Sequence, residues 1–327
     1  FPGSYVEILG SGTAPGLLIE DRIPFKEHPR TGTGTFRIEN ATLHNLKGIS
    51  VDFPLGVSGV IAGVAGSGKS SLMECFRKAW PLEADELVYI SQKDIGVSLR
   101  STPATYMEVA GDIRKVFAKA HKVKEEYFTF NGKGACPVCG GKGVIVSDMA
   151  FMDAIETTCE ACGGLRYSLE ALSYTYTSPE TGETLNIAQV MDLSVRLASR
   201  FFKGTVIEEK LRPLVDVGLQ YLHLNQALST LSGGELRRMK LASYLGTKGK
   251  VFIVDEPTDG LHMGDVRHIL GLFDSLVDQG NTVYLIEHNL DVIRSVDWVL
   301  ELGPGAGEDG GTVIYQGTPA GMLHCAG

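Results

Sequence analysis

The sequence predicts an α/β fold in which a nucleotide-binding domain with a mixed, largely parallel sheet is joined to a second, mainly helical domain. Three observations support this prediction. A glycine-rich loop, "GVAGSGKSS", follows the apolar strand "VSGVIAGV" and precedes the helical stretch "KSSLMECFRKAW". Two later apolar strands, "GKVFIVDEP" and "GNTVYLIEH", flank a helical stretch, as expected of a βαβ unit. Two Cys-x-x-Cys pairs lie between these regions, after a helical and basic stretch.

The composition is that of an ordinary globular protein. The chain has 327 residues, 43% hydrophobic and 21% charged, and its formal charge of −9 does not favour a basic coat over the whole surface. No apolar run reaches the ~18 residues of a membrane span and no signal peptide is visible, so we expect a cytoplasmic protein with no membrane partner. Because residue 1 is Phe, we expect the chain to begin partway through a longer protein.

The loop after the first apolar strand has the P-loop spacing G-x-x-x-x-G-K-[ST]. The backbone amides of such a loop and of the helix that follows cradle the β- and γ-phosphates of a nucleotide. Its lysine adds a positive charge, and its serine hydroxyl group ligates Mg²⁺. We therefore predict a site for ATP and Mg²⁺ at Gly63, Gly66, Gly68, Lys69, Ser70 and Ser71.

Polar residues end the other apolar strands. Asp255 ends "VFIVD", where a carboxylate can hold the water shell of Mg²⁺, and Glu256 after it can orient or deprotonate an attacking water. His288 ends the strand "VYLIEH" and could contact the γ-phosphate, while Gln92 after "LVYIS" could sense Mg²⁺ or water. We assign catalytic roles to Glu256, His288 and Gln92, and magnesium-ligand roles to Ser70 and Asp255.

The stretch "LSTLSGGELRRMKLASYLG" places Ser232, Gly233 and Gly234 before a helix, where free amides can bind an anion. A turn of small residues before a helix is common, so the order of the motifs matters more: P-loop, glutamine, "LSGGE", aspartate–glutamate, histidine. In this order the sequence resembles the ABC ATPase superfamily. The resemblance implies that the serine–glycine turn of one ATPase unit closes on the γ-phosphate held by another. ATP hydrolysis would then need a homodimer or a second ATPase half.

The cysteine pairs have the spacing of a four-cysteine zinc site. Cys136 and Cys139 are separated by 19 residues from Cys159 and Cys162, and glycines follow both pairs. Glycine eases the tight turns that such loops need, and four thiolates leave no open position on a tetrahedral metal. We therefore predict a structural Zn²⁺ held by these four residues.

Residues 111–142 carry a local excess of positive charge in an acidic chain. The seven basic residues are Arg114, Lys115, Lys119, Lys122, Lys124, Lys133 and Lys142. The three acidic residues are Asp112, Glu125 and Glu126, which leaves an excess of four positive charges. Such a stretch can contact the phosphates of DNA without reading bases. A solvated helix face is the alternative interpretation.

Within the superfamily, a cysteine module between glutamine and signature turn resembles the UvrA family, the damage-recognition ATPases of nucleotide excision repair. The matching fragments include "NLKGISVDFPLG", "STPATY", "CPVCGGKG", "CEACGGLRYSLEAL", "DEPTDGLH" and "GNTVYLIEHNLDVIRSVDWVLELGPG". They resemble the second, C-terminal ATPase half of those proteins. The resemblance implies a DNA-binding ATPase whose cysteine module belongs to the DNA-binding face, with lesion-bearing duplex as its partner.

Departures from the family pattern limit what the resemblance implies. One ATPase half is present, and the segment on which UvrB docks is absent, so binding of UvrB is not implied. Ala65 and Asp259 replace residues of the family's usual "SGSGKS" and "EPTTGLH", which fits a divergent paralogue, including those of drug-resistance systems. The ATPase subunit of a transporter and a clamp that does not hydrolyse ATP are the competing hypotheses. The cysteine module disfavours the first, and Glu256 disfavours the second.

The motifs also suggest domain boundaries. Residues 1–35, rich in Gly, Pro and Thr, are interpreted as a linker. Residues 36–92 and 247–327 would form the ATP-binding domain. Residues 93–246 would form a signature domain, with the zinc module at about 131–166.

Overall fold

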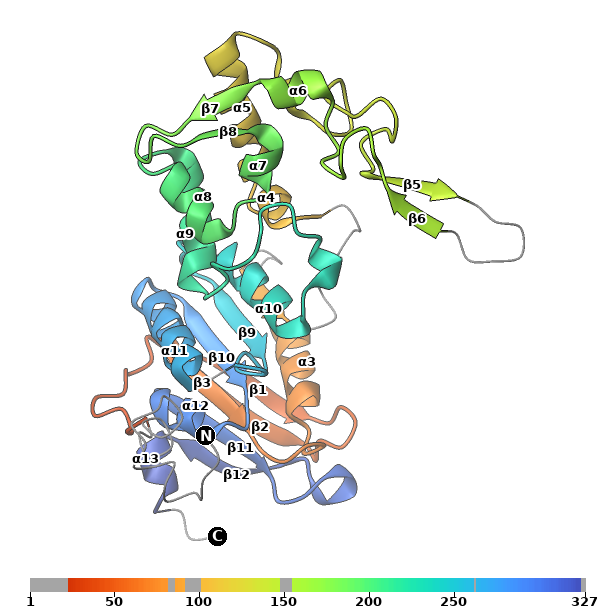
Figure 1. Ribbon diagram of the computed structural model, residues 1–327. Coiled ribbons are helices and arrows are strands. Elements are labelled where there is room, and N and C mark those ends of the chain that lie inside the picture. Colours follow the sequence, from red (N-terminus) through yellow and green to blue (C-terminus); the bar gives the residue numbers. More distant parts are fainter. Residues whose placement is uncertain (1–22, 82–85, 92–100, 148–154, 262, 325–327) are drawn as a thin grey trace, which may run out of the picture. The chain divides into compact units, whose positions relative to one another are not determined.

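The computed structural model describes residues 23–81, 86–91, 101–147, 155–261 and 263–324 (Figure 1). The chain divides into two compact units: the first contains the chain up to Gly96 and from Ser232 onward, and the second is Val97–Leu231. The boundary after Leu231 lies earlier than the expected residue 246. The helix that follows belongs to the first unit, where its Lys240 donates a hydrogen bond of 2.7 Å to the carbonyl of Tyr89.

The first unit contains a six-stranded sheet with the order β12-β11-β3-β10-β9-β4, as the α/β prediction required. All neighbouring strands are parallel except β12, which is antiparallel to β11. The strands are β3 (Ser58–Ala62), β4 (Leu87–Ile90), β9 (Val251–Asp255), β10 (Thr282–Ile286), β11 (Trp298–Gly303) and β12 (Thr312–Gly317). The expected antiparallel ribbon is formed by β1 (Gly34–Ala41) and β2 (Ile49–Leu55).

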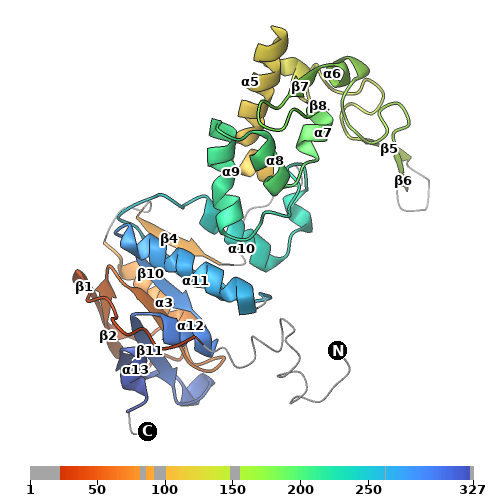
Figure 2. The same ribbon diagram turned by 60° about the vertical axis from the view of Figure 1, so that its left-hand side comes forward.

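Helices and the ribbon cover the sheet on its two faces (Figure 2). The helices of this unit are α3 (Lys69–Ala79), α10 (Gly233–Ala242), α11 (Met263–Asp278), α12 (Leu290–Ser295) and α13 (Pro319–Met322), with a 3-10 turn at Gly307–Asp309. On one face, Phe53 of β2 and Phe76 of α3 pack on Tyr284 and Trp298 of the sheet. The parallel strand β10 is buried throughout, because α11 covers its other face.

The second unit is mainly helical but also holds two short hairpins that the sequence analysis did not predict. Its helices are α4 (Pro103–Tyr106), α5 (Val109–His121), α6 (Leu169–Ser173), α7 (Ile187–Met191), α8 (Val195–Phe201) and α9 (Val206–Asp216), with 3-10 turns at Glu125–Phe128 and Leu228–Thr230. The antiparallel hairpins are β5 (Val144–Ser147) with β6 (Ile155–Thr158), and β7 (Thr175–Thr177) with β8 (Thr184–Asn186). Strands of three or four residues are too short for an alternation of apolar and polar residues to be recognised in the sequence. Among the described residues, no helix combines the length and apolarity needed to cross a membrane.

Part of the presumed linker is tied to the first unit through a buried carboxylate. The side chain of Asp297 is fully buried and accepts hydrogen bonds from the backbone amides of Arg30 and Ser58, each 2.9 Å long. Lys26 and Arg30 add ion pairs of 2.9 and 3.0 Å to the same carboxylate. Burial alone would raise the pKa of Asp297, but these hydrogen bonds lower it to about 2. The residues before β1 are therefore fastened to the start of β3 and β11.

Asp297→Asn should reduce the free energy of unfolding at neutral pH by about 2 kcal/mol, because it leaves two backbone amides and the partly buried cations of Lys26 and Arg30 poorly paired. The pKa of Asp297 is lower in the folded state, so its contribution is present above about pH 4 and is lost as the pH falls towards 2. Denaturant unfolding from pH 7 to pH 3 would measure both effects. Asp52→Asn is the control, since the Asp52–Arg37 pair is exposed and should contribute less than about 1 kcal/mol. Equal losses in the two variants would contradict this assignment.

Candidate nucleotide-binding site and cysteine cluster

Parallel pairing brings the predicted nucleotide-binding residues to one edge of the sheet. The strand β10 lies between β3 and β9, and its last residue, Ile286, is in register with Ile61 and with Asp255. The P-loop follows β3, Glu256 follows β9, and Glu287 and His288 follow β10. Carboxyl ends of parallel strands at such an edge are a common location for ligand sites.

A pocket of about 410 Å³ lies at this edge. Its lining comes from the P-loop and from the ends of β9 and β10: Gly63, Val64, Ala65, Lys69, Glu256, Ile286, Glu287 and His288. The structure thus brings together Lys69, Glu256 and His288, which are far apart in the sequence. Gly66 and Gly68 complete the loop, Ser70 and Ser71 lie in the first turn of α3, and Asp255 ends β9. Gln92 lies outside the described residues.

The P-loop conformation depends on glycine. Gly63 has φ 138°, and a side chain there would place Cβ 2.3 Å from the carbonyl oxygen of Leu302. Gly68, with φ 107°, forms the N-cap of α3. From outside the loop, Asn45 donates a hydrogen bond of 3.0 Å to the carbonyl of Gly66, as does the backbone amide of Gly307. These contacts hold the loop from the side of its carbonyl groups.

Charges of both signs meet in the pocket. The Lys69 ammonium group donates hydrogen bonds of 2.8 and 2.9 Å to the carbonyls of Gly63 and Val64. Burial lowers the pKa of Lys69, an effect that Glu256 and Asp255 oppose. Burial, together with the charge of Glu256, raises the pKa of Asp255. The two adjacent carboxylates therefore favour a cation beside them, which fits the predicted Mg²⁺ position.

Arg237 in α10 is a residue of the site that the sequence analysis missed. It is 3% exposed, and its Nη1 donates hydrogen bonds of 2.7 and 2.8 Å to the carbonyls of Asp255 and Glu256. Its Nη2 forms an ion pair of 3.1 Å with Asp259. Glu256 has φ 46°, a left-handed conformation that is uncommon for a residue with a side chain. The Arg237 contacts therefore hold Glu256 in a backbone conformation that it would otherwise seldom adopt.

Glu287 fastens the other side of the same segment. This carboxylate is 2% exposed and accepts hydrogen bonds from the hydroxyl and the backbone amide of Thr258, the latter 3.0 Å long. Its second oxygen accepts from the amides of His288 and Asn289, at 3.0 and 3.3 Å. One buried acid thus joins the segment after Glu256 to the segment that carries His288. No motif marks Arg237 or Glu287, because their partners are backbone groups brought near by the fold.

The signature turn begins α10. The Ser232 hydroxyl group accepts a hydrogen bond of 3.3 Å from the Glu235 amide, and the Glu235 carboxylate accepts one of 2.7 Å from the Ser232 amide. Gly234 packs closely against the turn after Glu256, since a Cβ there would lie 3.1 Å from the carbonyl oxygen of Asp259. In the described part of the chain, the pocket lining includes none of Ser232, Gly233 and Gly234.

The four predicted cysteines lie together in the second unit. All are buried, and their sulfur atoms lie within 4.8 Å of one another. The Cys136–Cys159 and Cys139–Cys162 sulfur atoms are 4.0 and 3.8 Å apart. Four thiolates at Zn–S distances of about 2.3 Å around a tetrahedral ion would be separated by about 3.8 Å, so the cluster fits zinc. The Gly143 amide donates a hydrogen bond of 3.3 Å to Cys139.

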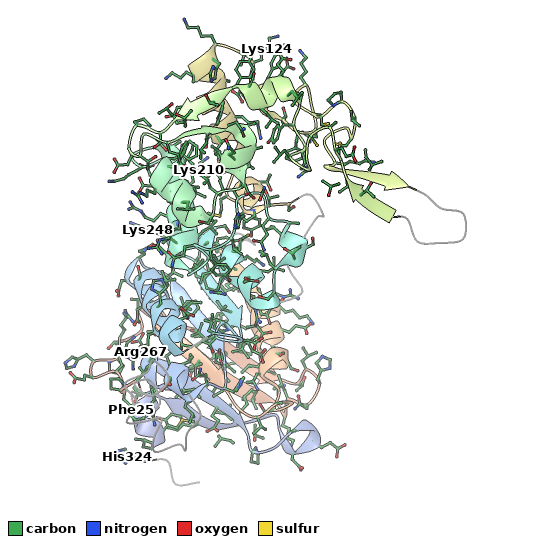
Figure 3. All side chains as sticks on the ribbon, in the orientation of Figure 1. Phe25, Lys124, Lys210, Lys248, Arg267 and His324 are labelled. Atoms are coloured by element: carbon green, nitrogen blue, oxygen red, sulfur yellow. The ribbon has the colours of Figure 1, made fainter. Side chains whose placement is uncertain are left out.

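The basic stretch lies along α5 and the first cysteine loop. Lys115 and Lys210 share Asp112 at 3.0 and 2.7 Å, and Lys133 pairs with Glu126 at 2.6 Å. Four other lysines of the stretch are exposed: Lys119, Lys122, Lys124 and Lys142. Figure 3 shows the positions of Lys124 and Lys210. Only part of the positive charge is therefore offset by neighbouring carboxylates.

The sheet order and the P-loop pocket define an ATP-binding domain of the ABC type. A family model described as "ABC transporter" matches residues 46–259, and the chain belongs to this family. Within it, the chain is similar to the UvrABC system protein A of Staphylococcus epidermidis, with 40% identity over 96% of this chain and 37% of the relative. The corresponding protein of Aquifex aeolicus is 43% identical over 91% of this chain and 35% of the relative.

A solved structure supports the same relationship. The crystal structure of UvrA2 from Deinococcus radiodurans matches with a TM-score of 0.82 and 37% identity, over 96% of this chain and 41% of that chain. The chain thus spans less than half the length of these relatives. The comparisons confirm the resemblance to the UvrA family and the ABC-type fold.

Gly63→Ala should lower the free energy of unfolding by about 2 kcal/mol, because the new Cβ meets the Leu302 carbonyl in a left-handed backbone. Gly271→Ala is the matched control. It lies within α11 with open space at its Cβ position, so the same change should stabilise the protein by about 0.5 kcal/mol. Thermal unfolding of both variants would measure the difference. A neutral Gly63→Ala would show that the loop adapts without cost.

Proposed function

We propose that this chain is an ATP-binding and ATP-hydrolysing part of a cytoplasmic, UvrA-like protein that binds lesion-bearing DNA in nucleotide excision repair. The observation that carries the catalytic part is the pocket in which the P-loop, Glu256 and His288 meet. The similarity to UvrABC system protein A supports the repair role. The exposed lysines of the second unit support contact with DNA phosphates.

In this proposal the P-loop amides and Lys69 bind the phosphates of ATP, and Ser70 and Asp255 hold Mg²⁺. Mg²⁺ would supply charge neutralisation at the phosphate oxygens. Glu256 orients the attacking water and accepts its proton, and His288 donates a hydrogen bond to the γ-phosphate. The Ser232–Gly234 turn would complete the site of a second ATPase unit, either another copy or a second half of the same protein. Gln92 would contact Mg²⁺ or water.

The four cysteines would hold one structural Zn²⁺, which fixes the two loops of the cysteine module. Hydrogen bonds from the Gly143 amide and neighbouring thiols lower the pKa of Cys139, whereas burial raises the pKa of its partner Cys162, so Cys139 is the first thiol of this pair to ionise. A thiolate is the form that binds metal. Through this module, the DNA-contacting surface would be attached to the ATPase.

We expect one zinc per chain by elemental analysis after purification without chelator. Cys159→Ser should lose the metal and lower the melting temperature of the second unit, because binding of structural zinc contributes directly to folding. Cys75→Ser is the control, since Cys75 lies outside the cluster and should keep the zinc. Metal-free protein with an unchanged melting curve would contradict a structural zinc.

Arg237→Lys should reduce the rate of ATP hydrolysis by about tenfold and leave ATP affinity within about twofold. Lysine keeps the charge but cannot hold both carbonyl groups in the same geometry, so Glu256 is displaced while the P-loop is not. Asp259→Asn, which removes only the ion pair, should have a smaller effect. Steady-state turnover and equilibrium binding of ATP would separate the two quantities. A loss confined to ATP affinity would exclude a role in positioning Glu256.

The proposed function is tested by DNA binding with intact and lesion-bearing duplexes, with and without ATP, over a salt series. Glu256→Gln should bind ATP and stop hydrolysis, so its DNA affinity should respond to ATP without turnover. Lys69→Ala should lose the ATP response because phosphate binding is lost. Affinity should fall steeply with salt if lysines contact phosphates. Absence of DNA binding at low salt in the wild-type chain would contradict the DNA-binding part.

A further inference from the structure

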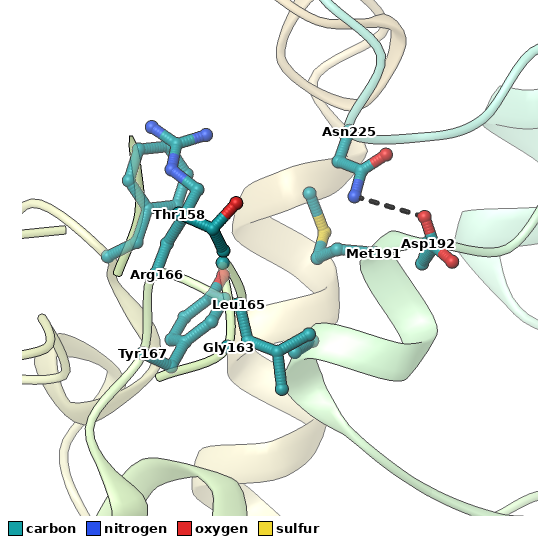
Figure 4. A pocket seen from close by; sticks show the side chains of 11 residues that line it. Thr158, Gly163, Leu165, Arg166, Tyr167, Met191, Asp192 and Asn225 are labelled. Atoms are coloured by element: carbon teal, nitrogen blue, oxygen red, sulfur yellow. Dashed lines mark hydrogen bonds between the residues drawn. The ribbon is translucent and has the colours of Figure 1, made fainter. Parts of the chain in front are cut away.

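A second pocket, of about 400 Å³, lies in the second unit between the second cysteine loop and the end of α7 (Figure 4). The lining residues that matter most are Leu165, Arg166, Tyr167, Met191, Asp192 and Asn225. Its volume is at the lower end of the range for small-molecule sites. It can receive one ring system and excludes a double helix.

Tyr167 places its hydroxyl group at the wall of this pocket. The residue is 5% exposed, and its ring packs edge-to-face on Phe130 with centroids 6.1 Å apart. Within the described residues, no group hydrogen-bonds its hydroxyl group, which Figure 4 shows directed towards Thr158. Burial raises the pKa of Tyr167 to about 12, so the hydroxyl group remains a donor at neutral pH. A hydroxyl group at a pocket wall that has no protein partner can donate a hydrogen bond to an acceptor oxygen of a ligand.

Arg166 adds a flat cationic surface to the same pocket. Its Cζ atom lies 3.6 Å from the centroid of the Phe130 ring, and its Nε donates a hydrogen bond of 2.8 Å to the Gly141 carbonyl. These contacts fix the plane of the guanidinium group. Unpaired nucleic-acid bases stack on such arginine planes and on aromatic rings.

The remaining walls supply apolar contact and groups of opposite polarity. Leu165 and Met191 line the pocket with apolar surface. At its exposed rim, Oδ1 of Asp192 accepts a hydrogen bond of 3.4 Å from the Asn225 amide and lies 3.6 Å from Nδ1 of His223. The second carboxylate oxygen of Asp192 can accept from an N–H group of a ligand. A planar ring that carries both a carbonyl oxygen and an N–H group would satisfy both sides.

We propose that this pocket binds a single unpaired nucleobase that carries a carbonyl oxygen, such as thymine, held by Tyr167 and Arg166 on one side and Asp192 on the other. The proposal rests on the proposed binding of DNA and adds a subsite to it. The base could belong to an opened DNA strand or to a free nucleotide. Adenine, which has no carbonyl oxygen, should bind less well.

The test compares fluorescein-labelled (dT)12, (dA)12 and their duplex, with unlabelled dTMP as a competitor. Tyr167→Phe removes only the hydroxyl group and should weaken binding of (dT)12 by about fivefold, the loss of one hydrogen bond, with duplex affinity unchanged. Leu165→Trp should fill the pocket and weaken (dT)12 at least as much. Leu169→Trp is the control, because Leu169 is 76% exposed and does not line the pocket.

Selective loss of (dT)12 binding in both pocket variants supports the proposal, and efficient competition by dTMP would assign the pocket to free nucleotides. Wild-type affinity for (dT)12 in both variants, or equal losses for strand and duplex, would overturn it. Those outcomes leave duplex binding by the wild-type chain intact, so they are distinct from failure of the proposed function. If the wild-type chain binds no DNA, the pocket cannot receive a base of an opened DNA strand. Direct binding of dTMP then decides whether it receives a free nucleotide.

Discussion

The parallel pairing of β10 with both β3 and β9 is the constraint on which the first unit depends. It places the ends of three strands in one register, so that a loop, an acid and a histidine from distant parts of the chain line one pocket. The strands β3, β9 and β10 are almost wholly buried. Residues that follow these strands are therefore the first that a ligand can reach. Charged and polar side chains at this end of the sheet can bind a ligand without disrupting the apolar core.

Three buried charges fasten the segments around this sheet. Asp297 holds the chain before β1, Glu287 joins the segments after β9 and β10, and Arg237 ties α10 to the backbone of Asp255 and Glu256. Glu287 and Arg237 bind mostly backbone groups, whereas Asp297 binds two backbone amides and the side chains of Ser58, Lys26 and Arg30. Backbone groups at the end of a strand or helix need partners of this kind. Buried charges are costly when unpaired, so each one specifies a single arrangement of the segments that it joins.

Motifs with a fixed spacing along the sequence could be predicted from the sequence. Residues whose role depends on tertiary contacts could not. The P-loop, the strand ends and the four cysteines follow patterns in which chemistry fixes residue type and interval. Arg237 and Glu287 resemble ordinary charged residues of a helix and a strand end, and nothing local marks their carbonyl and amide partners. The stretch before β1 was interpreted as a linker because of its Gly and Pro content, yet Lys26 and Arg30 anchor it to Asp297. The hairpins of the second unit were too short for their alternation to be read.

The connectivity of the sheet has a consequence for how the protein is made. The strand β3 ends at Ala62, but its two neighbours begin only at Thr282 and Trp298, after the whole second unit has been synthesised. The second unit is continuous in the chain and contains its own aromatic core, so it can fold on emerging from the ribosome. The P-loop strand must meanwhile wait with both edges unpaired, and pairings between residues so far apart in the chain form slowly. During translation, β3 and the P-loop that follows it are therefore exposed to aggregation and to chaperones until the last strands have been synthesised.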